Sequence, residues 1–257
     1  MGQRLGQHFL VRQAILERIA ENACPVNTGT IVEIGPGRGA LTSQLLARAE
    51  RVVAIEIDPV LVQYLRAKFR DEPRLTLLEA DVLKADLGQW GEVVVAGNVP
   101  YYITSPILEK TLLLGDQLIR AVFLVQKEVA QRLTARPGTR DYGFLSVQTQ
   151  LLSSPELLFG VPADAFRPPP KVDSAVVRLT PKQTAEFPAL DRTAFLDFVG
   201  HCFRHKRKTI RNNLVDSFER PLVDSIPETS RRAEQLSLPE FVELFRRVVS
   251  GGAAPVS

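Results

Sequence analysis

The residues Asn98-Val99-Pro100-Tyr101 combine an amide, a rigid backbone carbonyl and an aromatic ring within four positions. They follow the apolar run 93–97, which is typical of a buried strand, and a proline cannot continue such a strand inside a sheet. The Asn98 side-chain oxygen and the Pro100 carbonyl can accept hydrogen bonds from an amino group, and the Tyr101 ring can stack on a flat base. The tetrapeptide is equally typical of an ordinary strand-to-helix turn, so by itself it leaves both interpretations open.

Carboxylates close two further predicted strands. Glu56 ends the run 51–56, and Asp81 follows the run 75–78. In an open α/β sheet the carboxyl ends of the strands form one edge, where ligands bind, so we expect Glu56, Asp81 and Asn98 to share that edge. A carboxylate there can accept a hydrogen bond from an adenine amino group. For Asp81 the alternative is a solvated loop or a helix cap.

A glycine-rich turn, Gly35-Pro36-Gly37-Arg38-Gly39, lies between a predicted strand and a predicted helix. Glycines there let the backbone approach a ligand, and the helix N-terminus offers free N–H groups. The turn also matches the dinucleotide fingerprint, with Glu56 about 20 residues further on, where a ribose-binding acid belongs. The pattern predicts a nucleoside cofactor without deciding between NAD and S-adenosylmethionine. A glycine turn that only packs a helix on a strand is the alternative.

Phe166 precedes a run of three prolines, Pro168 to Pro170. Such a run is stiff and extended, so it would hold an aromatic ring in a fixed pose. A ring anchored in the hydrophobic core is the alternative.

Cationic side chains gather in a segment without acidic residues: Arg204, Lys206, Arg207, Lys208 and Arg211. A smaller set comes earlier in the chain: Arg132, Arg136 and Arg140. Contact with nucleic-acid phosphates is the functional interpretation. A solvated helix face is the alternative.

The elements that position these residues alternate along the chain. Strands are predicted at 30–34, 51–56, 75–78, 93–96 and 121–125, and helices at 13–23, 41–46, 59–69, 107–114 and 127–133. This alternation with short loops indicates a doubly wound parallel sheet. Further strands at 156–159 and 174–179 have too short a connection for a crossover helix, so they predict an antiparallel hairpin at the sheet edge. After a helix predicted at 143–152 and a composition shift near 181–188, only helices are expected, at 194–203, 209–214 and 238–249.

Composition sets further bounds. The chain has 257 residues, a net charge of +3 and a pI near 9.0, which fits a nucleic-acid partner without establishing one. Its two cysteines are far apart and its three histidines lack ligand spacing, so we expect no metal and a reducing, cytoplasmic location. No apolar run approaches the roughly 20 residues of a membrane span, and no secretory signal is expected.

Taken together, these motifs resemble those of the rRNA adenine N6,N6-dimethyltransferases of the KsgA/RsmA group. The resemblance runs from Gly6 to Ser237, and its most specific pieces are 32–39, 98–101 and 166–175. It implies a Rossmann-like class I methyltransferase sheet with a small all-helical C-terminal domain. The implied domains are an S-adenosylmethionine-binding catalytic domain over 1–184 and an RNA-binding domain over 185–257.

The resemblance also implies roles for individual residues. Those implied to bind S-adenosylmethionine are His8, Leu10, Gly35, Gly37, Glu56, Asp81 and Asn98. Glu56 would take the ribose hydroxyls and Asp81 the adenine amine. Asn98 and Pro100 would hold the target amine, and Tyr101 and Phe166 would sandwich the base. The family often has Asn at the position of His8 and a polar residue at that of Tyr102, to which we assign no role.

The activity implied is methylation of N6 of two adjacent adenines in a 3′-terminal hairpin of 16S rRNA, during maturation of the small ribosomal subunit. The implied partner is this rRNA or the subunit precursor, and we expect a monomer that binds no membrane. Alternatives are a large-subunit (23S) rRNA methyltransferase of the macrolide-resistance type and a non-catalytic ribosome-assembly or transcription factor. An NAD oxidoreductase is the weakest alternative, because it leaves 98–101 unexplained.

Overall fold

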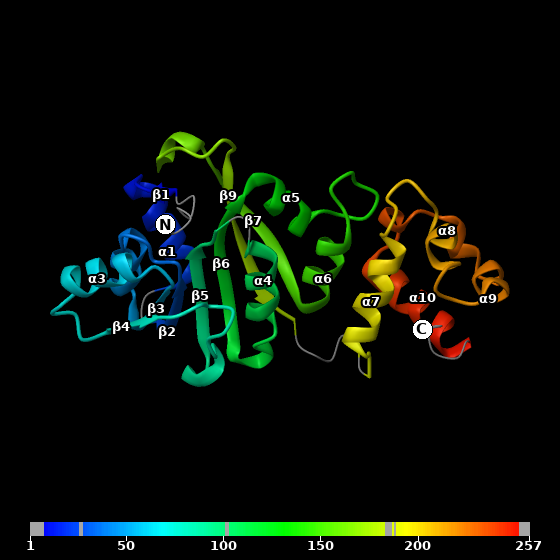
Figure 1. The fold of residues 1–257 in the computed structure, drawn as a ribbon, viewed down its shortest axis with the longest axis horizontal. Coiled ribbons are helices and arrows are strands. Elements are labelled where there is room, and N and C mark those ends of the chain that lie inside the picture. The colour runs from blue at the N-terminus through cyan, green and yellow to red at the C-terminus, as the bar shows by residue number, and fades with distance from the viewer. Residues whose placement is uncertain (1–7, 26–27, 101–102, 183–186, 188, 252–257) are drawn as a thin grey trace. The chain divides into compact units, whose positions relative to one another are not determined.

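The computed structural model describes residues 8–25, 28–100, 103–182, 187 and 189–251. The chain forms two compact units (Figure 1). One comprises residues 1–130 and 153–183, and the other comprises 131–152 and 184–257. The helical unit therefore recruits residues 131–152, which the sequence analysis assigned to the first domain.

The first unit contains a seven-stranded sheet with the order β4-β3-β2-β5-β6-β9-β7. Its strands are β2 Thr28–Ile34, β3 Ala49–Glu56, β4 Leu75–Glu79, β5 Val93–Asn98, β6 Leu118–Gln126, β7 Ser153–Val161 and β9 Ser174–Pro181. The five strands from β4 to β6 are parallel, and β9 pairs antiparallel with both β6 and β7. The predicted doubly wound sheet and edge hairpin are confirmed. The central strands read as continuous apolar runs because both of their faces are buried.

Three helices connect parallel strands: α2 Ala40–Leu46, α3 Pro59–Lys68 and α4 Thr104–Leu112. Helix α1 Gln13–Ala23 precedes β2, and α5 Lys127–Thr134 follows β6. The sheet residues Ile31, Val52 and Val94 pack with buried side chains of α1 and α2 in one core cluster. Helix α3 begins where Asp58 accepts hydrogen bonds from the backbone N–H groups of residues 60 and 61.

A second, two-stranded sheet was not predicted. Strand β1, Phe9–Leu10, pairs antiparallel with β8, Phe166–Arg167. The backbone N–H of Val11 extends this pairing by donating to the carbonyl of Ala165 at 2.9 Å. The pairing fixes the start of the described chain beside the segment that precedes the three prolines.

The second unit is helical, as predicted. It contains α6 Phe144–Leu152, α7 Arg192–Cys202, α8 Ile210–Leu214, α9 Arg220–Ser225 and α10 Leu238–Gly251, of which α9 was not predicted. Its core includes edge-to-face pairs of Phe195 with Phe245 and of Phe198 with Phe218. Val147 and Leu151 of α6 belong to the same core, which explains why 131–152 pack with this unit. No helix among the described residues is long and apolar enough to cross a membrane.

Candidate functional site

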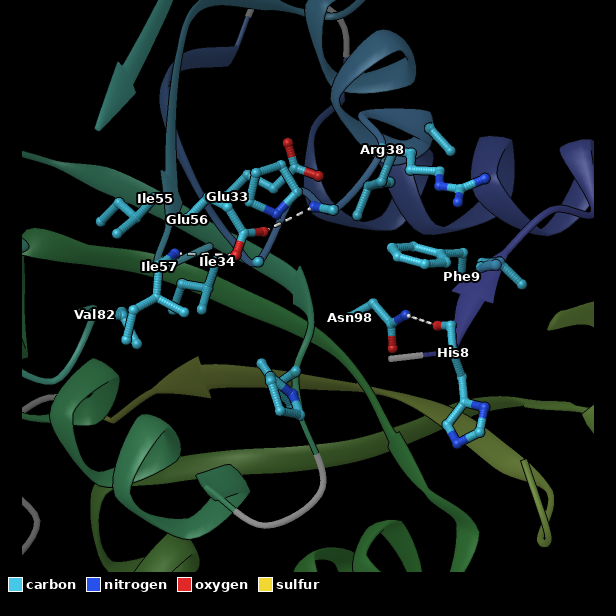
Figure 2. Close-up of a pocket in the computed structure, with 18 of the residues that line it drawn as sticks. His8, Phe9, Glu33, Ile34, Arg38, Ile55, Glu56, Ile57, Val82 and Asn98 are labelled. Atoms are coloured by element: carbon cyan, nitrogen blue, oxygen red, sulfur yellow. Dashed lines mark hydrogen bonds between the residues drawn. The ribbon is translucent and has the colours of Figure 1, made fainter. Parts of the chain in front are cut away.

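A cavity of about 440 Å³ opens at the carboxyl ends of β2, β3, β4 and β5 (Figure 2). This volume lies in the range of pockets that hold small molecules. Eight residues of the predicted site line it: His8, Leu10, Gly35, Gly37, Glu56, Asp81, Asn98 and Pro100. The fold therefore brings these eight predicted residues together. Tyr101 lies outside the described residues.

The glycine turn adopts a backbone that other residues rarely take. Gly35, Gly37 and Gly39 have φ values of +67°, +57° and +73°, in the left-handed region. A Cβ atom on Gly37 would lie 3.0 Å from the ring of Phe9, and one on Gly39 would lie 2.6 Å from Phe69. The turn thus needs glycine both for its dihedral angles and for the close approach of neighbouring rings.

Glu56 supports this turn from the end of β3. Its Oε2 accepts a hydrogen bond from the Gly37 N–H at 3.1 Å, and its Oε1 accepts bonds from the N–H groups of Ile57 and Asp58 at 3.0 Å each. Burial raises the pKa of Glu56 although these bonds favour the carboxylate. A carboxylate has about four acceptor positions, so Oε2 can still accept one more hydrogen bond.

Asn98 has a fixed orientation at the end of β5. Its Nδ2 donates a hydrogen bond to the backbone carbonyl of His8 at 3.0 Å, as Figure 2 shows. His8 is itself held through its Nδ1, which lies 2.8 Å from the carbonyl of Pro168. Because the amide nitrogen is engaged, Asn98 keeps its Oδ1 as the acceptor for a ligand. The β1–β8 pairing thus determines which atom of the amide is available.

The Pro100 carbonyl is not available to the target amine, although the sequence predicted it as an acceptor. It accepts hydrogen bonds from the Ile103 N–H and from the Thr104 hydroxyl, each at 3.2 Å. These bonds connect Pro100 to the start of α4 and use both lone pairs of the oxygen. In this arrangement Pro100 lines the cavity, but its carbonyl has no lone pair left for an amine.

The prediction that Phe166 stacks on a base is also not supported. Its side chain is fully buried and packs in the core cluster that contains Leu10, Ile15 and Ala165. Phe166 is not among the described residues that line the cavity. Strand β8 turns the ring inward, so the core-anchoring alternative holds.

Asp81 can serve both the loop after β4 and a ligand. Its Oδ1 accepts a hydrogen bond from the Leu83 N–H at 2.9 Å, which stabilises the turn after β4. The residue also lines the cavity. One carboxylate oxygen therefore serves the turn, and the other can accept a hydrogen bond from a ligand.

Glu33 is a cavity residue that the sequence analysis missed. It lies in β2, is only 1% exposed, and its Oε2 has no hydrogen-bond partner among the described residues. Burial raises its pKa to about 7, and nearby Glu56 adds to the effect, while Thr42 and Lys68 oppose it. A carboxylate within an otherwise apolar strand was the signal that could have identified it.

The predicted RNA-binding residues belong to the helical unit, and all five are exposed: Arg204, Lys206, Arg207, Lys208 and Arg211. They are not equivalent. Arg211 forms an ion pair with Asp224, with an Nε–Oδ1 distance of 2.6 Å. Lys206 donates through Nζ to the carbonyl of Arg140 at 2.8 Å. Arg204, Arg207 and Lys208 form no ion pair with the described residues.

The sheet order, the glycine turn and the acidic residue that ends β3 are those of a Rossmann-like class I methyltransferase. The chain belongs to the ribosomal RNA adenine dimethylase family, whose model matches residues 2–247.

A similar protein is the ribosomal RNA small subunit methyltransferase A of Acidobacterium capsulatum, which is 42% identical over 253 residues, or 95% of this chain and 89% of the relative. Among solved structures, a dimethyladenosine transferase from Plasmodium falciparum is 26% identical with a TM-score of 0.77, covering 92% of this chain and 96% of that one. The 23S rRNA methyltransferase ErmE is 31% identical with a TM-score of 0.69, covering 93% and 99%.

Proposed function

We propose that the protein transfers methyl groups from S-adenosylmethionine to N6 of two adjacent adenines near the 3′ end of 16S rRNA, giving N6,N6-dimethyladenosine in the maturing small subunit. The observation that carries this proposal is the 42% identity over nearly the full chain to a small-subunit methyltransferase. Among solved structures, the TM-score of 0.69 to the large-subunit enzyme ErmE is below the 0.77 to the dimethyladenosine transferase. A ribosomal substrate implies work in the cytoplasm.

The cavity fits S-adenosylmethionine chemically. This cofactor is a nucleoside with ribose hydroxyls, an adenine amine, a cationic sulfonium and an amino-acid end that carries an ammonium group and a carboxylate, and when bound it supplies an electrophilic methyl group. Glu56 retains an acceptor position for a ribose hydroxyl, and Asp81 retains one for the adenine amine. The Oε2 of Glu33, which has no hydrogen-bond partner among the described residues, can accept a hydrogen bond from the ammonium group, whose positive charge favours the ionised carboxylate. The glycine turn lets the ligand approach the backbone.

Asn98 orients the N6 amine of the target adenine in the rRNA. The nitrogen is a poor nucleophile because its lone pair is delocalised into the ring, so catalysis depends on positioning and on acceptors that favour a pyramidal nitrogen. With Nδ2 held by the His8 carbonyl, Oδ1 accepts a hydrogen bond from the amine. Only one N–H remains after the first methylation, and a single oriented acceptor serves both rounds.

Tyr101 completes this proposal on sequence grounds. It follows Pro100 directly and supplies the aromatic ring on which the flipped base would stack, an interaction worth roughly 1–3 kcal/mol. The target adenine must leave its own stack to reach the cavity.

Methyl transfer by an Asn98→Ala variant tests the proposal. Loss of an oriented acceptor is expected to slow transfer to small-subunit particles from an unmodified strain by about 100-fold or more, while RNA binding stays nearly intact. Asn22→Ala is the matched control, because Asn22 donates to the Arg18 carbonyl in α1 and does not line the cavity. Wild-type rates for Asn98→Ala would contradict the role of this residue.

Two further measurements separate the alternatives. Particles of both ribosomal subunits are offered to the wild-type protein, and methylation of only the large-subunit rRNA would support the 23S alternative. Calorimetry with S-adenosylmethionine tests the non-catalytic alternative, which predicts neither tight cofactor binding nor methyl transfer.

A further inference from the structure

Three segments of the helical unit hold most of the excess positive charge of the chain. Residues 135–142, 203–208 and 231–235 contain eight Lys and Arg residues and two acidic residues, which gives +6, whereas the whole chain carries +3. The remaining residues therefore sum to −3. A charge so unevenly distributed is the electrostatic signature of a surface that binds a polyanion.

Hydrogen bonds join these segments although they lie far apart in the sequence. Lys206 Nζ donates to the carbonyl of Arg140 at 2.8 Å, which links the second segment to the first. The N–H of Gly138 donates to the carbonyl of Glu234 at 2.6 Å, which links the first to the third. Residues 135–142, which the sequence analysis assigned to the other domain, thus lie beside the basic run 204–208.

A buried asparagine holds the central segment. Asn213 is 2% exposed, and its Nδ2 donates to the carbonyls of Cys202 at 2.7 Å and His205 at 3.3 Å. Its Oδ1 accepts a bond from the His205 N–H at 3.1 Å. The basic run is consequently part of an anchored loop rather than a solvated helix face.

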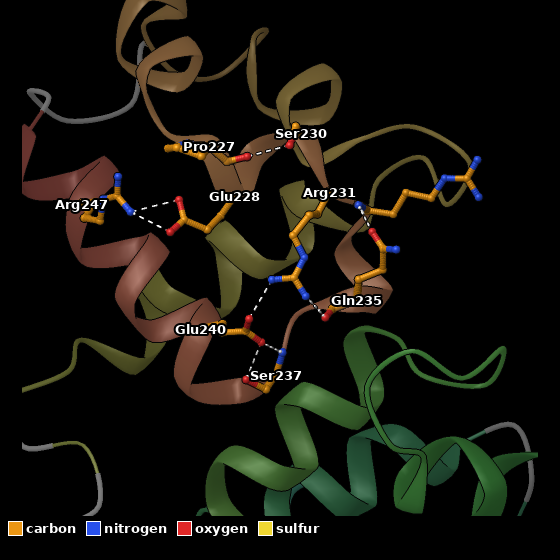
Figure 3. A network of polar contacts seen from close by, with 9 residues as sticks. Pro227, Glu228, Ser230, Arg231, Gln235, Ser237, Glu240 and Arg247 are labelled. Atoms are coloured by element: carbon orange, nitrogen blue, oxygen red, sulfur yellow. Dashed lines mark hydrogen bonds and ion pairs between the residues drawn. The ribbon is translucent and has the colours of Figure 1, made fainter.

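The third segment is held by the polar network in Figure 3. Arg231 contacts Glu240 at 2.7 Å, and Glu240 also accepts hydrogen bonds from the backbone and the hydroxyl of Ser237. The bonds from Ser237 and Arg231 lower the pKa of Glu240 to about 2, so it stays ionised. Arg231 is therefore neutralised within the scaffold, whereas the adjacent Arg232 is exposed.

Besides Lys206, whose Nζ binds the Arg140 carbonyl, six cations of these segments are exposed and have no ion pair with any described residue: Arg136, Arg140, Arg204, Arg207, Lys208 and Arg232. We propose that these six residues form one surface, here called the basic surface, that binds phosphates of the rRNA backbone. The inference rests on the proposed function and adds Arg136, Arg140 and Arg232 to the RNA-binding residues. It also gives residues 135–142 a part in substrate binding.

The composition of the basic surface favours RNA over a membrane. Binding at a lipid interface is strengthened by apolar side chains that enter the headgroup region. Among the described residues, the exposed large hydrophobic side chains all lie outside the three segments. Arginine-rich polar surfaces of this kind match the charge and geometry of phosphate groups.

The test is the salt dependence of binding to small-subunit particles from an unmodified strain. For Arg136→Ala/Arg140→Ala, binding is expected to weaken and the slope of log K against log salt to become shallower by about 1.5, because two phosphate contacts are lost. Arg136→Lys/Arg140→Lys keeps both charges and should retain most of the slope. Arg66→Ala/Arg70→Ala is the matched control, since it removes two exposed arginines from the other unit.

A wild-type slope for the Arg136→Ala/Arg140→Ala variant overturns the proposal of the basic surface. The proposal also fails if the wild-type protein binds anionic vesicles and this variant does not. The proposed function fails separately, if wild-type protein leaves the rRNA of these particles unmethylated. Calorimetry with S-adenosylmethionine is expected to give the wild-type affinity for the variant, because neither arginine lines the cavity.

Discussion

Replacing Glu33 by Gln removes a buried carboxylate from the cavity while keeping the size of the side chain. In the protein without ligand, the charged form of Glu33 is held away from water, with one oxygen lacking a hydrogen-bond partner among the described residues. If its charge serves a cationic ligand, the variant should fold more stably but bind S-adenosylmethionine less well. Such opposite effects are expected where a buried charge destabilises the free protein but contributes to ligand binding.

The magnitude follows from the pKa of Glu33. Burial raises this pKa from 4.5 to about 7, which at about 1.4 kcal/mol per pH unit corresponds to about 3 kcal/mol. The folded protein binds the proton more tightly than the unfolded chain. The stability that Glu33 contributes is therefore fully present below pH 4.5 and is lost as the pH rises through 7. From pH 5 to pH 8, the free energy of unfolding of Glu33→Gln should therefore increase by about 2 to 3 kcal/mol relative to that of the wild type.

Urea unfolding at several pH values measures this difference, with and without S-adenosylmethionine. Added cofactor is expected to stabilise the wild type more than the variant. Glu92→Gln, which removes an exposed carboxylate before β5, is the control for the lost charge. A constant stability difference between Glu33→Gln and the wild type from pH 5 to 8 would refute the account of Glu33, as would equal cofactor affinity.

Two further substitutions test the packing around the cavity. Gly37→Ala should lower the free energy of unfolding by about 1–2 kcal/mol and weaken cofactor binding. The φ of +57° at this position is unfavourable for alanine, and the new methyl group would lie 3.0 Å from Phe9. Gly29→Ala, where no atom lies within 4 Å, is the control in calorimetry, and equal affinity of both variants would contradict this view of the turn. Phe166→Ala should destabilise the protein by about 3–5 kcal/mol in urea unfolding, since the ring is fully buried. Unchanged stability with lost methyl transfer would instead restore the stacking role.

The amino-acid pattern was enough to predict the architecture and eight of the 26 described residues that line the cavity. Alternating apolar runs and helical periods predicted the parallel sheet, and the polar residues after successive strands predicted which edge carries the site. These inferences succeed because the carboxyl ends of parallel strands must meet at one edge, whatever the detailed packing. For the same reason, Glu56, Asp81 and Asn98 were correctly expected to share that edge.

Which atoms are available at the site depends on contacts between distant segments. Strand β1 is two residues long, too short for any periodicity, yet its pairing with β8 places the His8 carbonyl against Asn98. The same pairing turns Phe166 into the core. A sequence motif names a side chain, but its direction and its hydrogen-bond partners depend on segments far away in the chain, 90 residues in the case of Asn98 and His8. Asn98 is thus the one amide side chain among the described residues that line the cavity, while the Pro100 carbonyl accepts bonds from the start of α4.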